Sequence, residues 1–279
     1  MIGSNAMLVD LNMSTWTGRK LDKKVSDEID VSKGTKAKAG NYNKKLLAGS
    51  DKLEQIQKVV TAVRTWHYQQ TLPWSDGGSR LLPMINFFDY KQTLNNFEKQ
   101  FYDAVDSFLI EYPQLISSSA FTLGGMFDRN EYPTADDLRN KFNFKFVFIP
   151  VPDKGDFRID VEQQAKTELQ QQYEKYFQDK LNTAMKESWD RLHTVLTHIS
   201  ERLDYTDDSK KKFWDSTITN ATDLCALLTG LNITKDPKLE LAREMLEKAL
   251  KGVAPDDVRE SQAIRSSVKT KVDAILDMF

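Results

Sequence analysis

One stretch near the start of the sequence combines side chains that could bind a ligand. Trp16 is followed by Arg19 and Lys20, and then by Lys23 and Lys24. An indole ring offers a flat stacking face, and the neighbouring cations offer charge directed at phosphate groups. The segment therefore predicts nucleic-acid binding, but its composition fits two other roles equally well. It also suits an arm whose Trp16 docks into its own core, or a short segment that another protein recognises.

The histidines are poor candidates for a metal site. His193 and His198 are five positions apart, which places them roughly 140° apart around a helix. Asp190 precedes His193 and Glu201 follows His198 at the spacing of a carboxylate-bridged metal site. Such sites need Glu-x-x-His pairs on two helices and further inward carboxylates, which the sequence does not offer. We therefore expect no metal and no cofactor.

Motifs for phosphate binding or nucleophilic catalysis are also missing from the sequence. The pairs Gly77-Gly78 and Gly124-Gly125 lack the Gly-Lys-Ser/Thr ending of a phosphate loop and predict turns. Cys225 has apolar neighbours, which predicts a buried, unreactive thiol. Paired acids occur where helices are expected to begin, and there they favour the helix macrodipole rather than acid–base catalysis. These pairs are Asp136-Asp137, Asp207-Asp208 and Asp256-Asp257. We therefore expect a protein that is not an enzyme.

The composition is that of a folded protein in a reducing compartment. Of 279 residues, 40% are hydrophobic and 29% charged, and the formal net charge is −2. This balance argues against a disordered chain and against a surface that is basic throughout. A single cysteine, and the lack of an apolar run near the ~20 residues that span a bilayer, predict a cytoplasmic protein without a membrane partner. The stretch Gly3-Ser4-Asn5-Ala6-Met7 resembles a cloning remnant before a second start, and no signal peptide is apparent.

Residues 1–50 are predicted to form a basic N-terminal arm that is ordered only in part. From Trp16 to Lys52 basic residues outnumber acidic ones by ten to five, and apolar residues are sparse. Residues 51–204 predict a helical bundle with a β-hairpin insertion. Its first helix has apolar residues every three or four positions, and its second has a wide aromatic face that ends at Pro113.

The clearest elements follow. Residues 142–159 predict a β-hairpin, because phenylalanine alternates with other residues at its start and a turn divides it. Residues 161–203 keep a helical pattern without glycine or proline and predict a long spine helix. Its spacing is not a clean heptad repeat, so an antiparallel bundle is favoured over a coiled-coil zipper. Residues 205–279 predict a C-terminal subdomain of three short helices. The predicted fold class is therefore mainly α.

The tryptophan segment also carries a family resemblance. Asn12-x-Ser14-x-Trp16-Thr17-Gly18-Arg19-Lys20 resembles the opening of a family from phages and mobile elements, domain of unknown function 3150. The likeness continues in style over most of residues 8–204, although Leu21-Asp22-Lys23-Lys24 stands where the family often has a further basic-apolar pair. Genes of this kind tend to lie near genes for a MoxR-like ATPase and a von Willebrand factor A-like protein. The resemblance therefore implies an accessory to an ATPase assembly in the host-cell cytoplasm.

Three hypotheses for the function follow. The first is a non-enzymatic phage or mobile-element accessory protein that binds a partner protein, such as a MoxR-like ATPase or a host factor. The second is a nucleic-acid-binding accessory in replication or recombination that uses Trp16, Arg19, Lys20, Lys23 and Lys24. The third is a structural protein that forms a homo-oligomer through the long helix or the hairpin.

Overall fold

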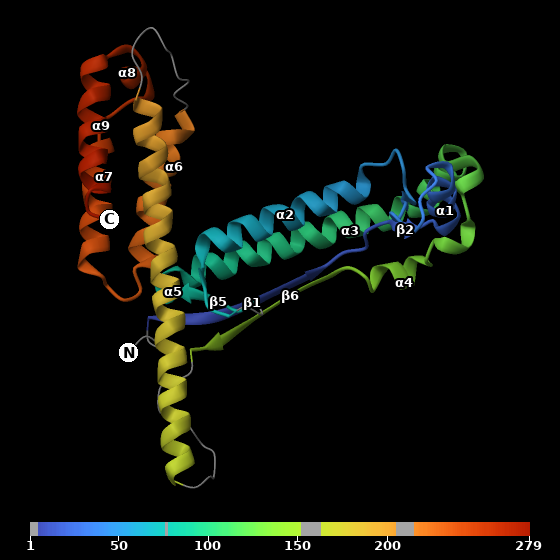
Figure 1. Ribbon diagram of the computed structural model, residues 1–279, viewed down its shortest axis with the longest axis horizontal. Helices are drawn as coiled ribbons and strands as arrows, with labels where there is room; N and C mark the ends of the chain where they lie inside the picture. The colour runs from blue at the N-terminus through green and yellow to red at the C-terminus, as the bar shows by residue number, and fades with distance from the viewer. Residues whose placement is uncertain (1–4, 76–77, 152–162, 205–214) are drawn as a thin grey trace. The chain divides into compact units, whose positions relative to one another are not determined.

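The computed structural model describes residues 5–75, 78–151, 163–204 and 215–279. Within these residues the protein is mainly helical, as the sequence predicts, with a small amount of sheet (Figure 1). The strands are β1 (Ala6–Ser14), β2 (Arg19–Leu21), β3 (Asn43–Lys45), β4 (Leu72–Pro73), β5 (Arg80–Pro83) and β6 (Asn143–Pro150). The helices are α1 (Lys23–Ser32), α2 (Lys52–Gln70), α3 (Phe87–Leu123), α4 (Ala135–Arg139), α5 (Gln163–Leu203), α6 (Asp215–Leu231), α7 (Pro237–Leu250), α8 (Pro255–Glu260) and α9 (Gln262–Leu276). Short 3-10 turns are η2 (Met84–Asn86), η3 (Gly124–Met126) and η4 (Arg129–Glu131).

The chain divides into two compact units. Unit 1 comprises Met1–Asp10, His67–Tyr90 and Val147–Phe279, and unit 2 comprises Leu11–Trp66 and Lys91–Phe146. Strands β1 and β6 and helices α2 and α3 each have one end in unit 1 and the other in unit 2. Both units are therefore discontinuous in sequence.

Unit 1 is built around the long helix α5. This helix confirms the spine predicted over residues 161–203, and its 41 residues span roughly 60 Å. Helices α6 and α9 pack against α5, and α7 packs against α6 and α9 (Figure 1). The core is apolar and includes residues that are fully buried at the helix contacts. Among them are Leu192, Leu196, Leu228, Leu246, Val272 and Ile275.

The C-terminal helices differ from the prediction of three in residues 205–279. The last predicted helix is divided at Ser261 into α8 and α9. Ser261 has an extended backbone (φ −110°, ψ 110°), and its hydroxyl accepts a hydrogen bond from Ile264 N at 3.3 Å. The buried Arg265 donates to the carbonyl oxygens of Val258 and Arg259 at the end of α8. A serine N-cap and this guanidinium satisfy the backbone groups that the break exposes.

The four-stranded sheet has the order β4-β5-β1-β6, with β5 antiparallel to both β4 and β1. Within the arm predicted over residues 1–50, residues 6–14 form β1. Ala6, Leu8 and Val9 are buried, so this strand contributes to the core of unit 1. Strand β6 confirms the first half of the hairpin predicted over 142–159, and its neighbour in the sheet is β1. The predicted return strand lies outside the described residues.

In unit 2 the helices α2 and α3 run antiparallel. Lys52 near the start of α2 pairs with Glu111 late in α3 at 2.7 Å, and Trp66 contacts Phe97 at 5.4 Å between ring centroids. The prediction that α3 ends at Pro113 is wrong, since the helix continues to Leu123. A proline inside a helix costs about 3 kcal/mol. Here the flanking turns are held by side chains that are buried on the same helix, Tyr112 and Ile116.

Candidate interaction site

Trp16 lies between β1 and β2 and packs into unit 2. Its ring centroid is 6.3 Å from that of Phe108 and 6.0 Å from that of Tyr112, the latter edge to face. The neighbouring Gly18 (φ +62°) lies close against Leu53, because a Cβ atom there would be 2.7 Å from Cδ2 of that leucine. The indole is half-buried, and these contacts are typical of a core aromatic side chain. Of the roles considered for Trp16, the geometry matches an arm that docks its tryptophan into its own core.

Arg19 and Lys20 lie on β2, which pairs with β3 in a two-stranded antiparallel sheet. Arg19 is opposite Lys45, and Lys20 is opposite Lys44. Like charges directly opposite each other destabilise a pair of strands. The side chains of Arg19, Lys20 and Lys45 are exposed, and none forms an ion pair within the described parts of the chain.

Lys44 differs from the other three cations of this hairpin because it is buried and paired. Its side chain is 6% exposed, and Nζ lies 2.7 Å from the Glu131 carboxylate and 3.5 Å from that of Asp22. It also donates to the Met126 carbonyl oxygen at 2.7 Å. Burial by itself would lower the pKa of Lys44, but the hydrogen bond to Glu131 and the charges of Glu131 and Asp22 raise the pKa overall. Lys44 is therefore a structural charge that fastens β3 to the η3 and η4 turns.

Lys23 and Lys24 form the start of α1. Asp22 is the N-cap, and its carboxylate accepts a hydrogen bond from Val25 N at 3.1 Å. The first turn of α1 contains no acidic residue, although the helix macrodipole favours acids at that end. Both lysine side chains are exposed. The two cations therefore add nothing favourable to the helix macrodipole.

The structure therefore divides the predicted site residues. Arg19, Lys20, Lys23 and Lys24 lie on consecutive elements with exposed side chains, whereas Trp16 is packed against aromatic rings of its own unit. The ring contacts of Trp16 are with its own core.

Sequence reasoning missed other members of this surface. From residue 31 to residue 50 the chain has five lysines and no aspartate or glutamate. Lys33, Lys36 and Lys38 follow α1 with exposed side chains, and Lys45 joins Arg19 only through the strand pairing. The run of lysines without acids could be seen in the sequence. The register of β3, which places Lys45 opposite Arg19, could not. We refer to residues 16–52 as the basic segment.

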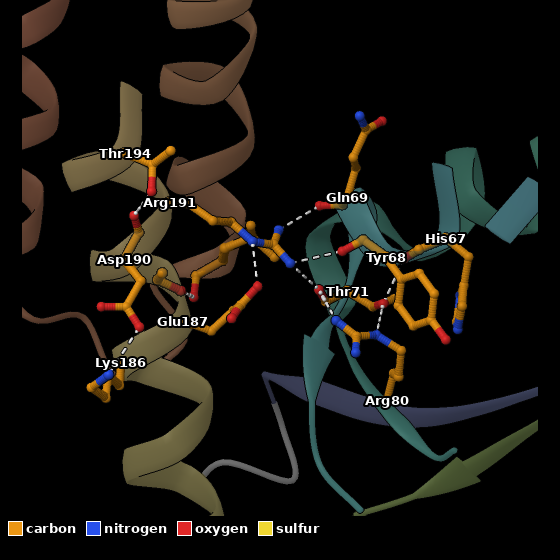
Figure 2. A network of polar contacts seen from close by, with 12 residues as sticks. His67, Tyr68, Gln69, Thr71, Arg80, Lys186, Glu187, Asp190, Arg191 and Thr194 are labelled. Carbon is orange, nitrogen blue, oxygen red and sulfur yellow. Dashed lines mark hydrogen bonds and ion pairs between the residues drawn. The ribbon is translucent and has the colours of Figure 1, made fainter. Parts of the chain in front are cut away.

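A separate network of polar groups in unit 1 surrounds the end of α2 (Figure 2). Arg191 of α5 donates to the backbone carbonyl oxygens of Tyr68, Gln69 and Thr71 at 2.7, 2.8 and 2.9 Å. Its Nε lies 3.1 Å from the Glu187 carboxylate. The last carbonyl groups of a helix have no partner within the helix. Arg191 therefore caps α2 and fastens α5 to that end of it.

Arg80 and His67 extend this network. Arg80 donates from Nε to the Thr71 hydroxyl at 2.7 Å, and its guanidinium lies 4.6 Å above the Tyr68 ring (Figure 2). His67 is buried, with Nδ1 2.6 Å from the Tyr90 hydroxyl. Burial and then the charge of Arg80 lower the pKa of His67 to about 4, and burial raises the pKa of Tyr90. The guanidinium donors serve carbonyl and hydroxyl groups at a helix end, so we assign the network a structural role.

The other residues weighed for chemistry lie on α5, on α6 and at helix starts. His193 and His198 on α5 are both exposed. Across the described ranges no group of three or more His, Cys, Asp or Glu side chains could hold a metal ion. Cys225 is buried as predicted, and burial raises its pKa to about 11, which keeps the thiol protonated. The acidic pairs predicted at helix starts are found in the first turns of α4 and α8, and the third pair lies outside the described residues.

No protein family, curated protein or solved structure matches this chain. Among the described helices, none is both long enough and apolar enough to cross a membrane.

Proposed function

We propose that this protein is a non-enzymatic accessory protein that binds an acidic surface of a partner protein through its basic segment. The observation that carries the proposal is the exposed set of cations on β2, α1, the loop after α1 and β3, which form no ion pair within the described ranges. These are Arg19, Lys20, Lys23, Lys24, Lys33, Lys36, Lys38 and Lys45.

The distribution of charge supports a local docking site. Ten of the 39 basic residues but only five of the 41 acidic residues fall in the basic segment, so the rest of the chain is net negative. Two of those ten cations, Lys44 and Lys52, are used internally in pairs with Glu131 and Glu111. Complementary charge at an interface directs the encounter and selects the partner.

A protein partner is favoured over nucleic acid by the side chains among the cations. Trp16 packs against Phe108 and Tyr112, which takes up part of the ring surface that a base would need. Exposed apolar side chains lie beside the lysines instead, with Ile29 45%, Val31 81% and Tyr42 40% exposed. Protein interfaces combine apolar anchors with a polar rim, which a phosphate backbone does not use.

The resemblance of the Trp16 motif to a phage and mobile-element family supplies the first partner to test. A MoxR-like ATPase is the proposed partner on that basis, and a host protein is the alternative.

The test is recovery of partners with the tagged protein from its native cells, with and without nuclease. A site variant changes Arg19, Lys20, Lys23 and Lys24 to Glu. A matched control makes the same charge change at exposed lysines of unit 2 outside the basic segment, namely Lys58, Lys91, Lys141 and Lys145. We expect a nuclease-resistant partner that the site variant loses by at least about tenfold and the control retains. Equal recovery with both variants would contradict the proposal.

Nucleic-acid binding is the second candidate, supported by the lysine run without acids from residue 31 to residue 50. It predicts that log affinity for single-stranded DNA falls steeply and linearly with log salt concentration. Partners that disappear on nuclease treatment would place this function first.

A further inference from the structure

Helix α1 and the loop after it line an open pocket of about 270 Å³ in unit 2. Ile29 and Lys33 line it from the helix side, and Ala39, Gly40 and Tyr42 line it from the loop side. Its walls are mostly apolar.

Hydrogen bonds hold the two sides of this pocket in place. Tyr42 N donates to the Ser26 hydroxyl at 2.9 Å, and that hydroxyl donates to the Asp22 carbonyl oxygen at 2.6 Å. Ala39 N donates to the Asp30 carboxylate at 3.3 Å. The loop is therefore tied to α1 at several points without any contribution from a ligand. A preformed site loses less conformational entropy on binding.

The pocket lies in a segment of net positive charge. Lys33 lies on its wall, and Lys36 and Lys38 follow in the same loop. The one acid on its wall, Asp30, already accepts the hydrogen bond from Ala39. Two further acids of α1, Asp27 and Glu28, are exposed, but over the whole basic segment ten basic residues stand against five acidic ones.

We propose that this pocket takes one large apolar side chain from an acidic segment of the partner protein. The inference rests on the proposed function and adds to it the apolar side chain that anchors the partner. The volume of about 270 Å³ is sufficient for one large apolar side chain, since a cavity of roughly 150 Å³ already holds a benzene ring. The lysines around it match carboxylates on either side of that anchor. The sugar-phosphate backbone of a nucleic acid has no apolar group that would fill the pocket.

Labelled synthetic peptides provide the test, with binding to the full chain measured by fluorescence polarisation. One peptide consists of Asp and Glu with a central Leu, and a second has Ser in place of that Leu. We expect the Leu peptide to bind at least about tenfold more tightly, because burying a leucine side chain gives that factor or more. The variant Ile29→Ser should remove this preference. The control Val31→Ser alters an exposed residue of the same helix that does not line the pocket, and it should change affinity by less than about twofold.

The outcomes separate this inference from the proposed function. Equal binding of the two peptides, or a Leu preference that survives in Ile29→Ser, would overturn the inference about the pocket. Neither result would affect the proposal that the charged surface binds a partner. The charge-reversal variant of the proposed function is tested separately. Its loss or retention of the native partner bears only on the charged surface. If an oligothymidylate binds more tightly than either peptide and Ile29→Ser leaves it unchanged, the surface binds nucleic acid and the pocket inference fails.

Discussion

Replacing Lys44 tests the structural account of the basic hairpin. Lys44→Met keeps the length of the side chain but removes its charge. The carboxylates of Asp22 and Glu131, which are 14% and 18% exposed, would then lose their common partner. Removing one partner of a buried ion pair costs about 3–5 kcal/mol. Water reaches both carboxylates to some extent, so we expect the free energy of unfolding to fall by about 2–4 kcal/mol.

The matched control is Lys20→Met. Lys20 is opposite Lys44 in the same pair of strands, but its side chain is exposed and forms no ion pair with described residues. The same chemical change there should alter the free energy of unfolding by no more than about 0.5 kcal/mol. Urea titration followed by far-UV circular dichroism measures both variants.

A double-mutant cycle isolates the pair. We expect Lys44→Met and Glu131→Gln together to destabilise the protein by about 1–3 kcal/mol less than the sum of the single changes, because their Nζ and carboxylate lie 2.7 Å apart. Additive effects, or a Lys44→Met loss no larger than that of Lys20→Met, would refute the assignment of Lys44 as a structural charge.

Three further outcomes follow from the two units. Trp16→Ala should lower the free energy of unfolding by about 2–3 kcal/mol by urea titration, since the half-buried ring packs on two aromatic side chains. In the same assay Arg191→Met should cost about 2–3 kcal/mol, because three carbonyl groups at the end of α2 lose a charged donor. The control Arg139→Met removes an ion pair with Asp106 in which the two side chains are 60% and 51% exposed, so it should cost less than about 1 kcal/mol. The pKa of His67 is lowered from 6.5 to about 4 in the folded protein, so between these pH values the unfolded chain binds one proton more. The free energy of unfolding is therefore highest above pH 6.5, and it should fall by about 3 kcal/mol as the pH drops to about 4. Unfolding measured across this pH range should show a flatter dependence for His67→Asn, and an unchanged dependence would exclude His67 as its source.

Hydrophobic periodicity correctly predicted an element whose structure depends on its own sequence rather than on distant contacts. Helix α5 has 41 residues without a glycine or proline, and an uninterrupted helical pattern of that length admits few alternatives. The same kind of local rule failed at Pro113, where buried neighbours on α3 keep the helix intact. No element was predicted for residues 6–14, which form β1 and pair with β5. In both cases the deciding contacts come from packing that a local pattern does not contain.

The candidate site shows the same limit at the scale of neighbouring side chains. Lys44 and Lys45 are adjacent and of one type, so composition gives both the same role. On a strand, successive side chains point to opposite faces. The register of β3 therefore sends Lys44 toward Glu131, 87 positions along the chain, and leaves Lys45 exposed opposite Arg19. The sequence predicted the sign and the approximate place of the charge, because these depend on composition alone. Which lysines are free to meet a partner depends on a strand pairing and a distant acid, and only the folded chain brings those together.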